Sequence, residues 1–412
     1  MRPARGDPEH RTADISDYLE HKRASVTVAG RSYVVASKQG VFSHGRLDPA
    51  SAMLAEQLAT VSPGATVLDL NCGNGLAGTV AALAGAGRVL LTDRNALNAE
   101  AAGRTLAENG ATTAMVHLAH GVQGIAGATP ADVVAIRIPR ERLAFQQLLA
   151  DAFHALRVGG VCLVAGATNE GIRTAAGTLE RIFGSERTLA RDAGHRLVMA
   201  TKRSDAPAVA GELASPYLDA EVFHRFEADL AGRTLDVFTR PGVFSWEHLD
   251  EATALVAEVM RVAPRDAVLD IGCGAGALGT LAGLRSADAR VLMLDADVEA
   301  VRCARRTAAA AGLVHAEVRT SDVGAAAAGE TFDVVVTNPP FHVGKATDLH
   351  VPMQFIADAH AALRPGGRMY LVANRTLPYE RAVAARFGAV ETLVDGVRFK
   401  VLGATRGGIV TR

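Results

Sequence analysis

The sequence predicts an α/β protein of two tandem domains, each a mostly parallel, twisted sheet flanked by helices and preceded by a small antiparallel hairpin. Two observations support this fold class. The same short motifs recur once along the chain, and apolar strand-like runs alternate with alanine-rich helical segments in each copy. The chain has 412 residues, 49% hydrophobic and 21% charged, so each half can bury a core of its own.

The internal repeat is visible in two landmarks. Gly-Val-Phe-Ser at residues 40–43 returns at residues 242–245, an offset of 202 (242 − 40). Val-Leu-Asp at residues 67–69 returns at residues 268–270, an offset of 201 (270 − 69). Landmarks that recur in the same order at a near-constant offset indicate a tandem duplication.

Both copies are expected to contain the same series of elements. The expected hairpins pair residues 25–28 with 32–36 and residues 223–228 with 234–239. Helices are expected at residues 49–59 and 251–261. Sheet strands are expected at residues 66–70, 88–92, 132–136, 267–271, 290–294, 317–320, 333–337 and 368–373.

The boundary between the copies is expected where turn-forming residues interrupt the periodic pattern, at residues 204–216. The predicted domains are therefore residues 1–205 and 216–412, with a linker over residues 206–215.

The most informative stretch follows a β-branched strand in the second copy. Asn338, Pro339, Pro340, Phe341 and His342 come directly after it. Proline lacks an N–H and fixes φ, so the chain must leave the sheet at the carboxyl end of the strand, where ligands bind in open α/β sheets. A rigid turn with hydrogen-bond acceptors, followed by an aromatic residue, suits a planar amine substrate.

A glycine-rich loop lies earlier in the same copy. Gly272, Gly274 and Gly276 follow a strand and precede a helix, and Asp295 ends the next strand. Glycines there let the backbone approach a nucleotide-like ligand, and the acidic residue is placed to bind ribose hydroxyls. A tight turn without a ligand and a helix N-cap at Asp295 are the structural alternatives.

Charge and cysteine content exclude few functions. The net charge is −1 and the isoelectric point is near 6.9, which does not indicate a polycation, although a local arginine patch can still contact phosphates. The four cysteines lack metal or redox spacing, and no secretory signal or membrane span is expected. These features predict a reduced, cytoplasmic protein.

The second copy resembles class I S-adenosylmethionine-dependent methyltransferases, and its details are similar to bacterial ribosomal RNA guanine-N2 methyltransferases of the RsmC/RlmG type. The segments that carry the resemblance lie at residues 241–245, 249–250, 338–342, 372–375, 377–379 and 398–401. The resemblance implies two Rossmann-like methyltransferase domains, a degenerate first one and a catalytic second one. It also implies S-adenosyl-L-methionine as the cofactor, and ribosomal RNA or a ribosomal subunit, with the small subunit favoured, as the partner.

The resemblance also implies roles for individual residues. The implied cofactor-binding residues are Asp270, Gly272, Gly274, Gly276, Asp295, Asp322 and Asn338. Asp270 would reach the methionine end, Asp295 the ribose, and Asp322 the adenine amine, although Asp322 could instead cap the following segment. The expected substrate contacts are His342, Lys345, Arg375, Arg398 and Lys400.

The expected catalytic residues are those of the proline turn. The Asn338 side-chain oxygen and the Pro339 carbonyl can accept the two hydrogens of an exocyclic amine, directing its lone pair at the methyl donor. Pro340 keeps the turn rigid, and Phe341 can stack on the base. In the alternative interpretation, Asn338 only bonds its own backbone and Phe341 is a core residue.

The first copy is expected to lack this chemistry. Asn71 stands where the second copy has Gly272, and Arg137 aligns with Asn338. A guanidinium cannot accept a hydrogen bond, so this copy cannot hold an amine in the same way. It is expected to support the second copy by packing or to hold RNA through Arg2, Arg5, Arg11, Lys22, Arg23, Arg137, Arg140 and Arg142.

Two other functions stay open from the sequence. One is methylation of another planar amine, such as adenine N6 or a protein glutamine, and the other is a non-catalytic RNA-binding assembly factor. A monomer is expected, because the duplication can supply a dimer-like arrangement within one chain.

Overall fold

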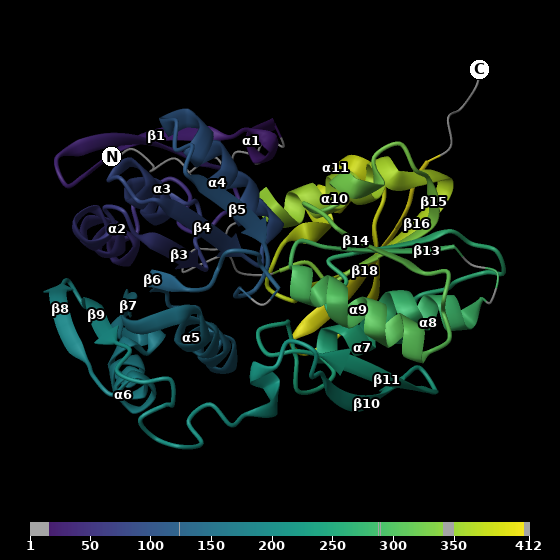
Figure 1. Cartoon of the computed structure of the whole chain (residues 1–412). Coiled ribbons are helices and arrows are strands. Elements are labelled where there is room, and N and C mark those ends of the chain that lie inside the picture. Colours follow the sequence, from purple (N-terminus) through teal and green to yellow (C-terminus); the bar gives the residue numbers. More distant parts are fainter. Residues whose placement is uncertain (1–15, 123, 287, 289, 341–349, 408–412) are drawn as a thin grey trace, which may run out of the picture.

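The computed structural model describes residues 16–122, 124–286, 288, 290–340 and 350–407. It contains two seven-stranded sheets, each preceded in the chain by a two-stranded antiparallel hairpin, and the two domains lie side by side (Figure 1). This arrangement confirms the predicted tandem α/β fold. Within the described ranges, no helix combines the length and the apolar composition that crossing a bilayer requires.

The first domain has the strand order β5-β4-β3-β6-β7-β9-β8. Its strands are β1 (Lys22–Val28), β2 (Arg31–Ser37), β3 (Thr66–Leu70), β4 (Arg88–Asp93), β5 (Ala114–Leu118), β6 (Ala131–Arg137), β7 (Leu156–Ala167), β8 (Arg187–Asp192) and β9 (His195–Thr201). Its helices are α1 (Ser16–Leu19), α2 (Pro49–Val61), α3 (Leu76–Leu83), α4 (Ala96–Asn109), α5 (Arg142–Ala155), η1 (Thr168–Glu170) and α6 (Ile172–Phe183).

The second domain repeats that order as β14-β13-β12-β15-β16-β18-β17. Its strands are β10 (His224–Leu230), β11 (Arg233–Thr239), β12 (Val268–Ile271), β13 (Val291–Asp295), β14 (Glu317–Thr320), β15 (Phe332–Thr337), β16 (Leu363–Asn374), β17 (Glu391–Asp395) and β18 (Phe399–Thr405). Its helices are η2 (Pro216–Leu218), α7 (Glu251–Val259), α8 (Ala277–Arg285), α9 (Val298–Ala310), η3 (Ala325–Ala327), α10 (His350–Ala362) and α11 (Tyr379–Phe387).

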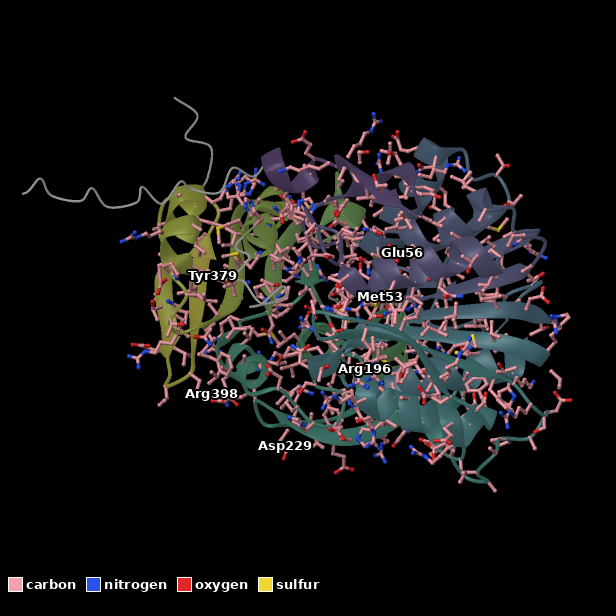
Figure 2. The ribbon with its side chains drawn as sticks, turned by 90° about the vertical axis from the view of Figure 1, so that its left-hand side faces the viewer. Met53, Glu56, Arg196, Asp229, Tyr379 and Arg398 are labelled. Atoms are coloured by element: carbon pink, nitrogen blue, oxygen red, sulfur yellow. The ribbon has the colours of Figure 1, made fainter. Side chains whose placement is uncertain are left out.

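Each sheet is covered on both faces. In the second domain, α7, α8 and α9 pack on one face, while α10 and α11 pack on the other (Figure 1). The central strands β12, β13 and β15 are parallel and nearly completely buried, which explains their continuous Val, Leu and Ile runs. Figure 2 shows Tyr379 and Arg398 on the second domain, and Met53, Glu56 and Arg196 on the first.

Four strands of the first sheet and two of the second were not predicted. In the first sheet these are β5, β7, β8 and β9, and in the second they are β17 and β18. Strand β7 begins directly where α5 ends, so no turn residue separates the two elements. Strands β5, β8 and β17 lie at sheet edges and are half exposed, which weakens their apolar pattern.

The two domains meet at equivalent loops. Asn95, which follows β4, forms an antiparallel bridge with Asp297, which follows β13 at an offset of 202 (297 − 95). The Ala96 amide donates to the Ala296 carbonyl at 2.8 Å, and the Val298 amide donates to the Arg94 carbonyl at 2.9 Å. Corresponding loops of the two copies therefore pair with one another, as the subunits of a two-fold dimer do.

Each domain also receives a short segment from the other. Tyr18 of α1 belongs to the core cluster of the second domain that contains α10. In the other direction, η2 and Arg240 reach the first domain, where the Arg240 guanidinium donates to the Gln147 side chain at 2.9 Å. Arg240 is fully buried and pairs with Glu299 at 2.6 Å. These reciprocal contacts join the two domains around the loops between them.

We expect Arg240→Leu to lower the free energy of unfolding by about 3 kcal/mol, because it removes the fully buried partner of Glu299 Oε2 and leaves only Arg302 paired with that carboxylate. Urea unfolding measures the change. Arg225→Leu is the control, since Arg225 pairs with Asp236 at the surface and its loss should change stability little. Equal losses in both variants would contradict a structural role for the buried pair.

Candidate functional site

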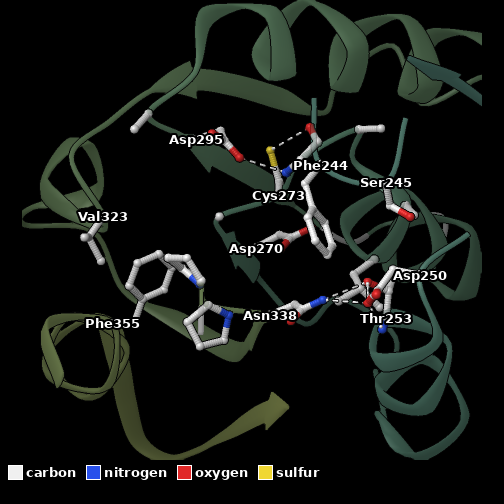
Figure 3. A pocket seen from close by; sticks show the side chains of 18 of the residues that line it. Phe244, Ser245, Asp250, Thr253, Asp270, Cys273, Asp295, Val323, Asn338 and Phe355 are labelled. Atoms are coloured by element: carbon white, nitrogen blue, oxygen red, sulfur yellow. Dashed lines mark hydrogen bonds between the residues drawn. The ribbon is translucent and has the colours of Figure 1, made fainter. Parts of the chain in front are cut away.

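A cavity of about 570 Å³ lies at the carboxyl ends of the second domain's central strands (Figure 3). The glycine loop after β12, Asp295 of β13, Asp322 after β14 and Asn338 after β15 all line it. The strand order reverses between β12 and β15, so the cavity occupies the position where open α/β sheets bind ligands. The structure thus brings the predicted residues from four separate strand ends to one site.

The glycine loop adopts the backbone that its sequence predicts. Gly272, Gly274 and Gly276 have φ values of 72°, 54° and 81°, in the left-handed region that favours glycine. A Cβ atom at Gly272 would approach the Phe355 ring to 2.9 Å, and one at Gly276 would approach the Ala304 Cβ to 2.8 Å. The loop therefore needs glycine at these two positions for packing as well as for φ.

Two carboxylates anchor this loop and the first turn of the helix that follows it. Asp270 accepts a hydrogen bond from the Gly279 amide at 2.8 Å, and Asp295 accepts one from the Gly274 amide at 2.8 Å. Burial raises the pKa of Asp270 to about 7. Burial, reinforced by nearby Asp297, raises the pKa of Asp295 to about 6. A cationic ligand in the cavity would favour the ionised form of both groups.

Asp322 is held by the first domain. Its Oδ1 accepts a hydrogen bond from the Tyr18 hydroxyl at 2.6 Å, and its Oδ2 pairs with the Lys38 ammonium. Tyr18, Gly40, Asn95 and Leu97 of the first domain line the cavity with it. Sequence reasoning missed these residues, because nothing in the chain indicates that one copy closes the site of the other.

The proline turn presents Asn338 in a defined orientation. The Asn338 side-chain nitrogen donates to Asp250 Oδ2 at 2.9 Å and to Thr253 Oγ1 at 3.1 Å, and both partners belong to the start of α7 (Figure 3). These bonds fix the side-chain amide through its nitrogen, and no group among the described residues donates to its oxygen. Pro339 and Pro340 line the cavity beside it. Phe341, His342 and Lys345 lie outside the described residues.

The predicted phosphate contacts differ in exposure. Arg375 and Arg398 have side chains that are 53% and 70% exposed and pair with Asp395 and Glu251. Lys400 is buried and pairs with Glu380 at 2.5 Å, so it is not a surface group. Its burial, which the sequence pattern did not indicate, argues against a contact with RNA.

The equivalent site in the first domain is nearly filled. The cavity there measures about 20 Å³ and is lined by Asn71, Arg137 and the adjoining loop. The Asn71 side chain donates to the Arg137 carbonyl at 2.7 Å, and Arg137 is buried between Asp48 and Glu170. This packing leaves little space for a ligand at the equivalent site, and the degenerate role of the first copy stays a prediction. Because Arg137 is buried, it cannot also contact RNA. The side chains of Lys22, Arg23, Arg140 and Arg142 are exposed.

Comparison with known proteins places this geometry in a family. The model of the family described as "Methyltransferase small domain" matches residues 32–199 and again residues 234–403. The chain belongs to this family. Both matched regions coincide with the two sheets, so each copy is a methyltransferase-type domain.

Relatives in this family carry one recurring name. A protein of Pseudomonas entomophila named ribosomal RNA small subunit methyltransferase C is 35% identical over 276 residues, which is 67% of this chain and 80% of that protein. A protein of the same name from Hahella chejuensis is 42% identical, over 42% of this chain and half of that protein. A solved structure, described as the T. thermophilus 16S rRNA N2 G1207 methyltransferase (RsmC) in complex with AdoMet and guanosine, is 30% identical with a TM-score of 0.80. The match covers 95% of this chain and 99% of the chain in the solved structure.

S-adenosylmethionine, the methyl donor that this class of fold implies, fits the residues of the second domain. The cavity has room for it, the glycine loop permits close approach, and Asp270 and Asp295 can supply negative charge for a cation. At the equivalent site of the first domain, the cavity measures only about 20 Å³.

Proposed function

We propose that this protein transfers a methyl group from S-adenosylmethionine to the exocyclic N2 amine of a guanine in small-subunit ribosomal RNA. It is an S-adenosylmethionine-dependent rRNA (guanine-N2-)-methyltransferase of tandem-domain architecture. The observation that carries the proposal is the orientation of Asn338. Its nitrogen is bound by Asp250 and Thr253, and its oxygen, which receives no hydrogen bond from the described residues, can accept one from an amine at the cavity.

The chain's residues position the amine and do not act as a strong base. The Asn338 oxygen and the Pro339 carbonyl accept the two N2 hydrogens, which draws the nitrogen lone pair out of conjugation with the ring and toward the donor. The bound cofactor supplies the methyl group on a positively charged sulfur. A carboxamide suits this role because it offers an acceptor with no charge to desolvate. The proton leaves after transfer, when alkylation has made the amine acidic.

The remaining roles follow from position. The glycine loop and Asp270 hold the methionine end of the donor, Asp295 holds the ribose, and Asp322, itself anchored by Tyr18 and Lys38, faces the adenine. Phe341 stacks on the target base, and Arg375 and Arg398 are the exposed groups placed to meet RNA phosphates. The protein acts in the cytoplasm, where ribosomal subunits assemble. A monomer suffices, because the two copies already form a dimer-like contact.

Methyl transfer to defined substrates tests the proposal. The protein is incubated with donor labelled in its methyl group and with ribosomal subunits, free rRNA, DNA or a protein extract. We expect label in guanosine of small-subunit rRNA. Label in adenosine or in glutamine would instead support another planar amine, and no label in any substrate would support a non-catalytic RNA-binding factor.

A further inference from the structure

The duplication allows the two copies of one carboxylate to be compared. Asp48 and Asp250 are related by an offset of 202 (250 − 48), and each begins a helix by accepting a hydrogen bond from the backbone amide three residues later. Each also binds a side chain at the carboxyl end of the fourth strand of its sheet, which is Arg137 in the first copy and Asn338 in the second. The two sites therefore share one framework.

In the first copy, both oxygens of the carboxylate are used by a planar group. Arg137 Nε donates to Asp48 Oδ2 at 2.8 Å, and Arg137 Nη2 donates to Asp48 Oδ1 at 3.2 Å. Arg137 Nη1 donates to the carbonyl of Ile138, the counterpart of Pro339, at 3.1 Å. The guanidinium also lies against the Phe42 ring, 5.1 Å from its centroid. One planar array of N–H groups thus spans the carboxylate and the turn carbonyl.

In the second copy, the framework remains but the planar group does not. The Asn338 nitrogen takes the place of Arg137 Nε at Asp250 Oδ2, which also accepts from the Thr253 amide and hydroxyl. Among the described residues, no group donates to Asp250 Oδ1. Asp250 lines the cavity, as does Phe244, the counterpart of Phe42, whose side chain is exposed (Figure 3).

We propose that Asp250 Oδ1 accepts the N1–H of the target guanine and so selects guanine as the methylated base. Guanine carries N1–H and N2–H₂ on adjacent atoms of one edge, which is the arrangement of N–H donors that Arg137 presents in the first copy. Asp250 then takes N1–H while Asn338 and Pro339 take the N2 hydrogens. Adenine has an acceptor at N1, which a carboxylate repels. This inference rests on the proposed guanine-N2 activity and adds the residue that reads the base.

Exchanging one atom of Asp250 tests the proposal. In Asp250→Asn, the side-chain oxygen can still cap α7 and hold Asn338, while the new NH₂ group faces the cavity. That donor opposes guanine N1–H but matches 2-aminopurine, which has the N2 amine and an acceptor at N1. In the variant, guanosine loses one hydrogen bond and 2-aminopurine riboside gains one, and each change is worth about tenfold in affinity. We therefore expect the preference for guanosine over 2-aminopurine riboside to fall by about 100-fold.

The readout is binding, with the full-length protein and S-adenosylhomocysteine present. The fluorescence of 2-aminopurine riboside gives the affinity of that ligand directly. Its displacement by guanosine gives the affinity of guanosine. Glu251→Gln is the matched control, because it removes the same charge from the adjacent residue, which pairs with the exposed Arg398, and should leave the preference unchanged.

Three results would overturn the proposal: no preference for guanosine in the unmodified protein, equal weakening of both ligands in the Asp250→Asn variant, or binding of neither ligand by a folded variant. Each result would show that Asp250 only caps α7 and holds the Asn338 side chain, and does not recognise the base. Failure of the proposed function is a separate result, in which the unmodified protein transfers no methyl group to guanosine in RNA although its preference for guanosine is intact.

Discussion

Replacing Asn338 with alanine is expected to reduce methyl transfer on the order of 100- to 1000-fold while cofactor affinity stays near that of the unmodified protein. The side-chain oxygen is the acceptor that aims the amine, and its effect is felt as the nitrogen changes geometry during transfer. The glycine loop and the three aspartates do not depend on it, because its hydrogen bonds run to Asp250 and Thr253 of α7.

Single-turnover transfer and calorimetric titration with S-adenosylhomocysteine separate the two effects. Asn74→Ala is the matched control, since Asn74 lies in the glycine loop of the first copy and the second copy carries Ala275 at the equivalent position. Normal transfer by Asn338→Ala would show that the acceptor mechanism is wrong. Loss of cofactor affinity in the same variant would instead place Asn338 in the donor site.

Replacing Asp270 with asparagine is expected to abolish measurable cofactor binding at neutral pH and to stabilise the ligand-free protein. The carboxylate is almost fully buried, and burial raises its pKa from the usual range of an aspartate to about 7. An ionised group in that position opposes folding by up to about 4 kcal/mol, the free energy that corresponds to the difference between its folded-state and ordinary pKa values. A neutral amide can keep the bond to the Gly279 amide but cannot balance a cationic ligand.

The pH dependence of stability follows from the same shift. The folded-state pKa lies above the unfolded one, so between about pH 4 and 7 the folded chain binds more protons and its free energy of unfolding falls as the pH rises. The gain from Asp270→Asn should therefore be largest near pH 8 and vanish near pH 4. Cofactor affinity of the unmodified protein should rise over pH 6 to 8, as Asp295 and Asp270 ionise.

The first copy supplies the control for this prediction. Asp69 accepts from the Gly78 amide at 2.8 Å, and burial raises its pKa to about 7, as at Asp270. We expect Asp69→Asn to stabilise the protein similarly without changing cofactor affinity. Urea unfolding at pH 5 and pH 8 with cofactor titration measures both properties. Parallel loss of cofactor affinity in the two variants would contradict a single donor site in the second domain.

Much of the fold was predictable because the duplication presents most elements twice, so that the sequence pattern of an element can be compared between the two copies. The paired hairpins, the buried central strands and the glycine loop have strong local patterns, and the turn at Asn338 is marked by two prolines. Their convergence follows from the topology of parallel sheets, in which successive strands end at the same edge.

The contacts between the copies were not predictable from local patterns. Tyr18 and Lys38 bind Asp322, which lies far away in the sequence, and no periodicity encodes such a contact. The burial of Lys400 against Glu380 depends on the pairing of β18, which was not predicted. Asp250 directly precedes the predicted helix at residues 251–261, and only the structure shows that it binds Asn338 and lines the cavity.

The position of the methyl group on the product tests the central claim most directly. Small-subunit rRNA methylated by the protein is digested to nucleosides, and the methylated guanosine is identified by mass spectrometry against the N1, N2 and N7 isomers. An amine held between the Asn338 oxygen and the Pro339 carbonyl predicts N2-methylguanosine alone. Methylation at N1 or N7 would show that these acceptors do not hold the reacting nitrogen.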